Sequence, residues 1–208
     1  MNEAIQILHT ITSQVSLIEF LAVSFSIIYV VLAAKGNIWC WLAAIISVSL
    51  YVYICYNAKL YVETILQIFY LFMAFWGYLS WKSINEKSQD PILLDKKATI
   101  KEIKLSSHII FICFGVVFTF ISGYLFSIYS DAKMPLVDSF TTIFSLIATY
   151  MVVKKILSTW LYFIVIDIVS IYLYYSRDLY FSSILFIIYS IIAVIGYYNW
   201  TKILVNND

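Results

Sequence analysis

An acidic residue, Asp167, lies deep inside a hydrophobic run in the C-terminal part of the chain. Trp160, Phe163, Ser170 and Tyr174 are three, four or seven residues from Asp167 or from one another, so in a helix they share one face with it. A carboxylate flanked by aromatic rings suits an organic cation, because the charges pair and the rings stack on a flat cation. The alternative is structural, with Asp167 bonded to a neighbouring helix. We favour the binding role, because an acid inside a membrane-spanning helix is costly and is usually functional.

The composition indicates an integral membrane protein. Of the 208 residues, 63% are hydrophobic and 12% are charged, whereas soluble domains are about 25% charged. The three cysteines have no CxxC spacing, so they predict neither a disulfide framework nor a metal site.

Continuous apolar runs predict an all-α polytopic membrane protein. A helix that crosses about 30 Å of hydrocarbon needs about 20 apolar residues, and transmembrane strands would instead alternate residue by residue. Seven segments meet this length, and turn residues separate them. The predicted helices are 17–34, 38–57, 61–81, 106–129, 137–154, 158–175 and 179–201.

The sequence also repeats itself at a distance of 119 residues. Trp41 matches Trp160 and Trp81 matches Trp200, without a gap, and the match extends over three helices. Because one helix separates the two copies, we expect parallel repeats that enter the membrane from the same face, arranged 3+1+3. Such repeats are typical of transporters, which bind their substrate near the midplane where the halves meet.

These patterns divide the chain into six parts. Residues 1–16 form either a short amphipathic helix on the membrane or a frayed terminus. The predicted parts are an N-terminal segment, 1–16; a first repeat, 17–81; a cytoplasmic loop, 82–105; a linker helix with its loop, 106–135; a second repeat, 136–201; and a cytoplasmic tail, 202–208.

The distribution of lysine and arginine predicts the orientation. The loops after the odd-numbered helices and the C-terminal tail hold ten of these residues, whereas the opposite side holds Lys59, Lys133 and Arg177. By the positive-inside rule, the N-terminus faces outward and the C-terminus faces the cytoplasm.

Polar and aromatic residues on other helices add candidates for a binding site. One small polar stripe, which either lines a wet cavity or allows close helix packing, consists of Asp138, Thr141, Thr142, Ser145 and Thr149. Trp39, Trp81 and Trp200 lie near helix ends, which is typical of interfacial belt residues. The predicted substrate-binding residues are Asp167, Phe163, Trp160, Gln67, Tyr70, Tyr189, Thr141, Ser145, Ser47 and Trp41.

Catalytic patterns are missing from the sequence. It has no Ser-His-Asp set, no HExxH motif and no glycine-rich phosphate loop, and His9 and His108 each stand alone. We therefore expect no enzyme activity, no cofactor and no metal.

The pattern of these residues resembles the Pnu family of bacterial vitamin transporters over nearly the whole chain. Three positions depart from the family pattern: Phe163 stands where a second tryptophan is usual, and Asp167 and Ser47 stand where many riboside carriers have Asn. The residues that carry the resemblance are Asp138, Ser139, Ser145, Trp160, Asp167, Ser170, Leu179, Tyr180, Tyr189, Gly196 and Trp200, with Trp41, Leu60, Tyr61, Gln67, Tyr70, Gly77 and Trp81 in the first half.

The resemblance implies a duplicated, SWEET-like fold in the bacterial inner membrane, assembled as a homotrimer. It also implies facilitated diffusion of a vitamin that is trapped inside by phosphorylation. Relatives carry nicotinamide riboside, thiamine, riboflavin or deoxynucleosides. Because Asp167 suits a flat cation, we expect nicotinamide riboside first and thiamine second, and the non-transporting alternative is a membrane protein that binds a partner.

Overall fold

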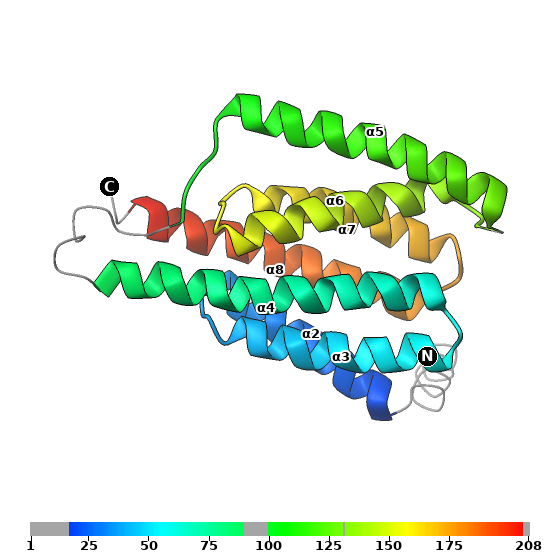
Figure 1. Ribbon diagram of the computed structural model, residues 1–208, viewed down its shortest axis with the longest axis horizontal. Coiled ribbons are helices and arrows are strands. Elements are labelled where there is room, and N and C mark those ends of the chain that lie inside the picture. Colours follow the sequence, from blue (N-terminus) through cyan, green and yellow to red (C-terminus); the bar gives the residue numbers. More distant parts are fainter. Residues whose placement is uncertain (1–16, 90–99, 131, 206–208) are drawn as a thin grey trace, which may run out of the picture.

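The computed structural model describes residues 17–89, 100–130 and 132–205, and the described part of the chain is all-α (Figure 1). The prediction of seven helices is confirmed there. The expectations for residues 1–16 and for the tail after residue 205 fall outside the described residues. The helices are α2 (Leu17–Ala34), α3 (Cys40–Asn57), α4 (Tyr61–Gln89), α5 (Leu105–Tyr129), α6 (Pro135–Val153), α7 (Thr159–Tyr175) and α8 (Tyr180–Val205).

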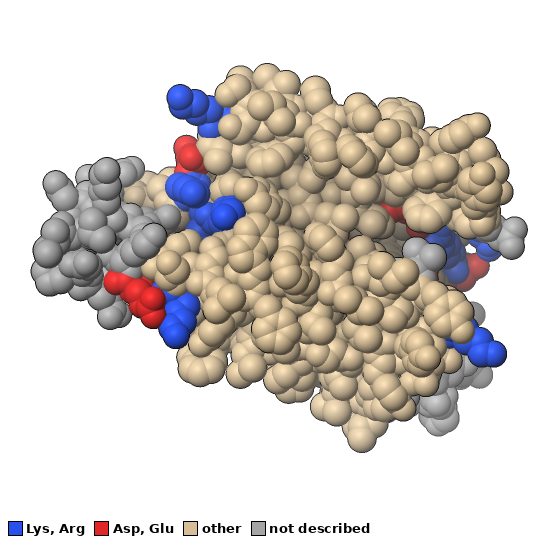
Figure 2. Space-filling view, viewed as in Figure 1, with Lys and Arg blue, Asp and Glu red and all other residues tan. Residues whose placement is uncertain are grey.

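Six of these helices are long and apolar enough to cross a membrane. The remaining helix, α7, has 17 residues. At 1.5 Å per residue it is about 26 Å long, which is near the lower limit for spanning the hydrocarbon core. Figure 2 shows charged side chains at the two ends of the molecule and an uncharged band between them, as a membrane-embedded surface requires.

The third predicted helix is longer than expected. α4 continues past Trp81 to Gln89, so the first eight residues of the expected loop 82–105 are helical. Lysine and glutamate favour helix, and Lys82 pairs with Glu86 one turn later at 3.9 Å. The apolar run therefore marks where α4 leaves the hydrocarbon but not where the helix ends.

The helices pack in a pattern that recurs when it is shifted by 119 residues. α2 packs on α3 and α3 on α4, and in the same way α6 packs on α7 and α7 on α8. Between these groups, α2 contacts α8 and α6 contacts α4. We call α2–α4 the first half and α6–α8 the second half. α5 packs against α6 at the edge of the bundle (Figure 1).

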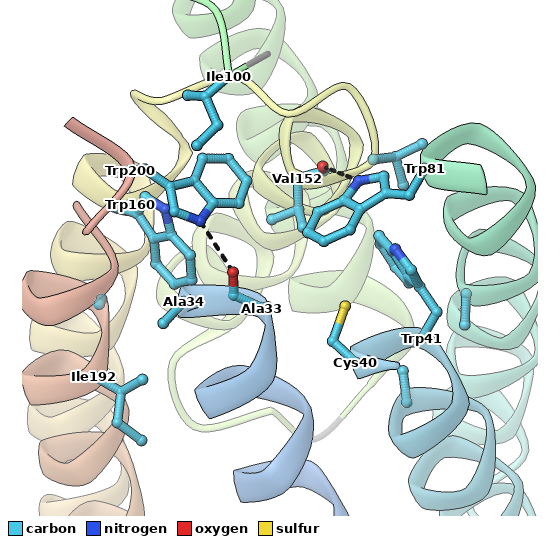
Figure 3. Packing of buried hydrophobic residues seen from close by; sticks show 14 of the residues in the cluster. Ala33, Ala34, Cys40, Trp41, Trp81, Ile100, Val152, Trp160, Ile192 and Trp200 are labelled. Atoms are coloured by element: carbon cyan, nitrogen blue, oxygen red, sulfur yellow. Dashed lines mark hydrogen bonds between the residues drawn. The ribbon is translucent and has the colours of Figure 1, made fainter. Parts of the chain in front are cut away.

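Four buried tryptophans form the core between the two halves. Trp81 donates a hydrogen bond from Nε1 to the Val152 carbonyl at 3.1 Å, and Trp200 donates one to the Ala33 carbonyl at 3.0 Å (Figure 3). Donors and acceptors are both 119 positions apart. Both indoles are fully buried, so the interpretation of Trp81 and Trp200 as interfacial belt residues is wrong, although Trp39 is 59% exposed.

A short segment before α5 covers this end of the core. Lys101 donates its backbone N–H to the Lys155 carbonyl at 3.0 Å and accepts one from Leu157, also at 3.0 Å. These two bonds hold the segment on the α6–α7 turn, and Ile100 is buried among the tryptophans (Figure 3). The segment therefore closes the bundle at the end where α2, α4, α6 and α8 meet.

Candidate functional site

A cavity of about 310 Å³ lies between the two halves of the bundle. Six helices line it, namely α2, α3 and α4 from the first half and α6, α7 and α8 from the second. This volume is within the range of small-molecule sites. Of the ten predicted site residues, the cavity lining includes Asp167, Phe163, Trp160, Gln67, Tyr70, Tyr189, Ser145, Ser47 and Trp41.

Asp167 is the charged residue of this lining. It lies near the middle of α7 and is only 4% exposed. Among the residues that the structure describes, no side chain or backbone group donates a hydrogen bond to its carboxylate. Among the described residues, therefore, no hydrogen bond from Asp167 to a neighbouring helix supports the structural alternative. A buried acid without a partner is costly and can be compensated by a bound cation or donor.

Aromatic rings line the same cavity as Asp167. Phe163 lies one turn before Asp167 on α7, and its ring centroid is 6.4 Å from that of Trp160. Phe186 of α8 also lines the cavity, with its ring perpendicular to that of Tyr189 at 5.8 Å. Such walls combine apolar surface with π-faces that attract a cation.

Tight packing of tryptophan against glycine fixes one end of the cavity. A Cβ atom at Gly77 would lie 2.4 Å from the Trp41 ring, and one at Gly196 would lie 2.7 Å from the Trp160 ring. Only glycine leaves space for the two indoles, which is why the sequence repeats this pair at 119 residues. The indole N–H groups of Trp41 and Trp160 are buried without an acceptor among the described residues.

Hydrogen bonds between the halves hold the middle of the cavity. The Ser26 hydroxyl of α2 bonds the Tyr189 hydroxyl of α8 at 2.5 Å. The side chains of the equivalent residues, Tyr70 of α4 and Ser145 of α6, also interact with each other. These contacts join the same helix pairs as the tryptophan bonds do.

Two of the predicted substrate-binding residues donate their hydroxyl groups to backbone carbonyls. Ser47 lines the cavity but donates to the Ala22 carbonyl at 2.8 Å, which joins α3 to α2. Thr141 lies one turn from Ser145 and is not among the described lining residues; its hydroxyl donates to Val137 and Asp138 of its own helix. The predicted polar stripe on α6 therefore reaches the cavity only at Ser145 and Thr149.

The start of that stripe forms an ion pair instead. Asp138, in the first turn of α6, accepts a hydrogen bond from Arg177 in the α7–α8 turn at 2.6 Å. Both side chains are about one quarter exposed, so the pair lies at the surface of the helix bundle. It ties α6 to the turn between α7 and α8.

Sequence reasoning missed several lining residues that the repeat itself identifies. Twenty of the 22 lining residues form ten pairs that are 119 positions apart. Ser26 pairs in this way with the predicted Ser145, and Phe186 with the predicted Gln67. The two remaining lining residues are Tyr29 and Tyr51.

Sequence comparisons match this chain to one family of transporters. Residues 16–202 match the model of the nicotinamide mononucleotide transporter family. The nicotinamide riboside transporter PnuC of Neisseria mucosa is 27% identical over 85% of this chain and 69% of its own length. PnuC of Haemophilus influenzae is 26% identical over 85% of this chain and 76% of its own length.

A crystal structure of the vitamin B3 transporter PnuC has a similar fold. Its TM-score is 0.73 with 24% sequence identity, and the match covers 99% of this chain and 89% of that chain. The family match, the two relatives and this fold together confirm the resemblance to Pnu-type transporters. The family match spans most of the sequence, and its members are transporters, which excludes the partner-binding alternative. This multi-pass membrane protein therefore belongs to the nicotinamide mononucleotide transporter family and is a transporter, not an enzyme.

Proposed function

We propose that this protein imports nicotinamide riboside. One observation carries the proposal: the partnerless carboxylate of Asp167 lies in an aromatic cavity between the two halves. Nicotinamide riboside carries a pyridinium ring, which is flat, aromatic and positively charged. The names of the relatives from Neisseria mucosa and Haemophilus influenzae support the same substrate.

In the proposed complex, the carboxylate and the aromatic rings of the cavity bind the substrate in different ways. The Asp167 carboxylate balances the positive charge, so the cation has a counter-charge when it leaves water for a low-dielectric environment. Phe163 and Trp160 offer ring faces to the pyridinium. Exclusion of water from such a cavity lowers the local dielectric constant, which strengthens the attraction between the acid and the cation.

Thiamine is the second candidate substrate. Its thiazolium ring is also a flat aromatic cation, and the acid at position 167 would balance its charge in the same way. Riboflavin is neutral and would leave the carboxylate without a counter-ion.

We propose that the halves are parallel repeats, residues 17–81 and 136–201, joined by the linker helix and arranged 3+1+3 as in a duplicated SWEET-like fold. The recurrence of helix contacts, tryptophan bonds and cavity residues at one offset supports this arrangement. The lysine distribution supports an inner-membrane orientation with the N-terminus outside and the C-terminus in the cytoplasm. Facilitated diffusion, trapping by phosphorylation and a homotrimer follow from the resemblance and complete the proposal.

Equilibrium binding to the purified full-length protein tests the substrate. Labelled nicotinamide riboside should bind, unlabelled riboside should displace it, and thiamine should compete less well. Ligand binding to the folded state must also raise the melting temperature. Stronger competition by thiamine than by the riboside would contradict nicotinamide riboside as the substrate and favour thiamine. If neither compound binds, both candidate substrates are contradicted.

A further inference from the structure

Two layers of indoles close the cavity at the end of the bundle that holds Trp81 and Trp200, which we call the tryptophan end. Trp41 and Trp160 line the cavity, whereas Trp81 and Trp200 are fully buried behind them. The ring centroids of Trp41 and Trp81 are 5.5 Å apart and those of Trp160 and Trp200 are 5.4 Å apart, both edge to face. The rings of Trp81 and Trp200 meet at 6.0 Å. A solute can therefore leave the cavity at this end only when these indoles separate.

Hydrogen bonds join the two halves symmetrically at the tryptophan end. Besides the two indole bonds, Ser80 donates to the Val153 carbonyl at 3.2 Å and Asn199 donates to the Ala34 carbonyl at 3.3 Å. Donors and acceptors are again 119 positions apart. The repeat by itself therefore gives a closure to which both halves contribute alike.

Residues 100–104, which we call the strap, break this symmetry. They precede α5, and the two backbone hydrogen bonds of Lys101 hold them on the α6–α7 turn. The positions 119 residues before the bonding partners of Lys101 are Gly36 and Ile38, in the turn between α2 and α3. No described segment pairs with that turn in the same way. The strap is therefore an addition to the repeat and bonds to the second half.

The strap places one apolar side chain in the contact between the halves. Ile100 is only 5% exposed and belongs to the core cluster that contains Trp81 of the first half and Trp200 of the second. Figure 3 shows it at the outer end of this cluster. The turn that carries the strap also reaches the first half, because the Lys155 ammonium lies over the Trp81 ring, 4.7 Å from its centroid. The backbone of the strap thus bonds to one half, while its side chain packs into a cluster made by both.

We propose that the strap is a latch on the exit at the tryptophan end, and that Ile100 is the side chain that holds it shut. The strap moves with the second half, because Lys101 is bonded to the α6–α7 turn and the helix that follows, α5, packs on α6. Separation of the halves takes the tryptophan cluster apart and exposes Ile100 to water, which makes opening less favourable. The strap therefore sets how often this exit opens. The inference goes beyond the proposed function and does not depend on which vitamin the cavity binds.

Two native thiols can report opening at the two ends of α3. Cys40 begins α3, is fully buried and belongs to the same core cluster as Ile100 (Figure 3). A hydrophilic maleimide can modify Cys40 only when the tryptophan end opens, so the rate of modification follows the open fraction. Cys55 lies near the opposite end of α3, is 9% exposed and is the matched reporter for that end. The third cysteine, Cys113, is exposed and is replaced by Ala throughout.

The test measures the rate of maleimide modification of the full-length protein in lipid nanodiscs, where both membrane faces meet the reagent. With Cys40 as the remaining thiol, Ile100→Ala removes three buried carbon atoms and should raise the rate roughly 10- to 100-fold. Lys101→Pro keeps Ile100 but removes the N–H that bonds the α6–α7 turn, and it should raise the rate roughly three- to tenfold. Glu102→Ala, at an exposed position of the strap, is the matched control and should change the rate less than about twofold.

The same variants are then compared with Cys55 as the remaining thiol, and its rate should not rise. Unchanged modification of Cys40 in either folded variant would refute the latch, because both the side chain and the backbone bonds of the strap are required. Equal acceleration at Cys40 and Cys55 would also refute it, since the strap would then stabilise the whole fold rather than one exit. Lys101→Pro decides the question if Ile100→Ala does not fold.

Discussion

Replacing Asp167 with Asn tests both the stability and the binding role of the carboxylate. The substitution keeps the shape of the side chain and removes its charge. Two unit charges 4 Å apart at an effective dielectric constant of 20 attract by about 4 kcal/mol, and part of this offsets the cost of removing both from water. Charge-assisted hydrogen bonds contribute about 1.5–3 kcal/mol net, so the dissociation constant for nicotinamide riboside should rise roughly 10- to 150-fold.

The stability of the ligand-free protein should change in the opposite direction. Asp167 is buried and has no partner among the described residues, so the charge costs free energy until a cation binds. Asn carries no charge and is cheaper to bury. The Asp167→Asn variant without ligand should therefore unfold at the same or a higher temperature than the wild type.

The assay combines calorimetric binding with thermal unfolding in detergent. Asp178→Asn is a suitable control, because Asp178 is exposed in the α7–α8 turn and has a backbone φ of 60°, which Asn tolerates well. It should change neither quantity. A marked fall in the melting temperature of ligand-free Asp167→Asn, with unchanged riboside affinity, would mean that the acid locks the bundle, and the reasoning would be refuted.

Three further substitutions test the packing around the cavity by thermal unfolding. Gly196→Ala places a Cβ atom 2.7 Å from the Trp160 ring, so it should cost about 1–3 kcal/mol of stability, and an unchanged melting temperature would contradict the observed packing. Trp81→Phe removes the bond to the Val152 carbonyl and should cost about 1–3 kcal/mol; equal stability would show that this bond contributes nothing. Lys59→Gly relieves a φ of 59° after α3 and should add up to about 1 kcal/mol, and destabilisation would refute this strain.

Most of the helical fold could be predicted, because lipid imposes one strong rule. A spanning segment must be apolar over about 20 residues, so the hydrophobic runs gave the positions of all seven described helices. Outside the hydrocarbon, hydrophobicity no longer determines where a helix ends. It did not predict that α4 continues to Gln89, because the polar residues after Trp81 form helix equally well in water.

The tryptophans illustrate why position along a helix was a poor guide to burial. Trp39, Trp81 and Trp200 all lie near helix ends, yet only Trp39 is exposed. Sequence position cannot distinguish an end that faces lipid from an end that faces another helix. The repeat held the missing signal, because Trp81 and Trp200 are equivalent by the 119-residue offset and Trp39 corresponds to Ser158.

Periodicity predicted which face of a helix points inward but not how far along it the cavity extends. Thr141 shares a face with Ser145, yet it lies one turn beyond the described lining. Tyr29 lies in an apolar stretch of α2 without a charged neighbour nearby, so its sequence context gave no indication of a site. Its place in the cavity depends on α3 and α8 packing beside α2, which a local pattern does not encode.

The reciprocal tryptophan bonds limit how a protein of this kind can be assembled. Each indole of the pair Trp81 and Trp200 finds its carbonyl acceptor on the opposite side, at Val152 and Ala33. Neither half contains the acceptor for its own tryptophan, so an isolated half would expose a large aromatic surface and an unpaired N–H donor. A chain that carried a single half would have to associate with an identical copy, so that the tryptophan of each chain binds the carbonyl of the other, as in a symmetric dimer.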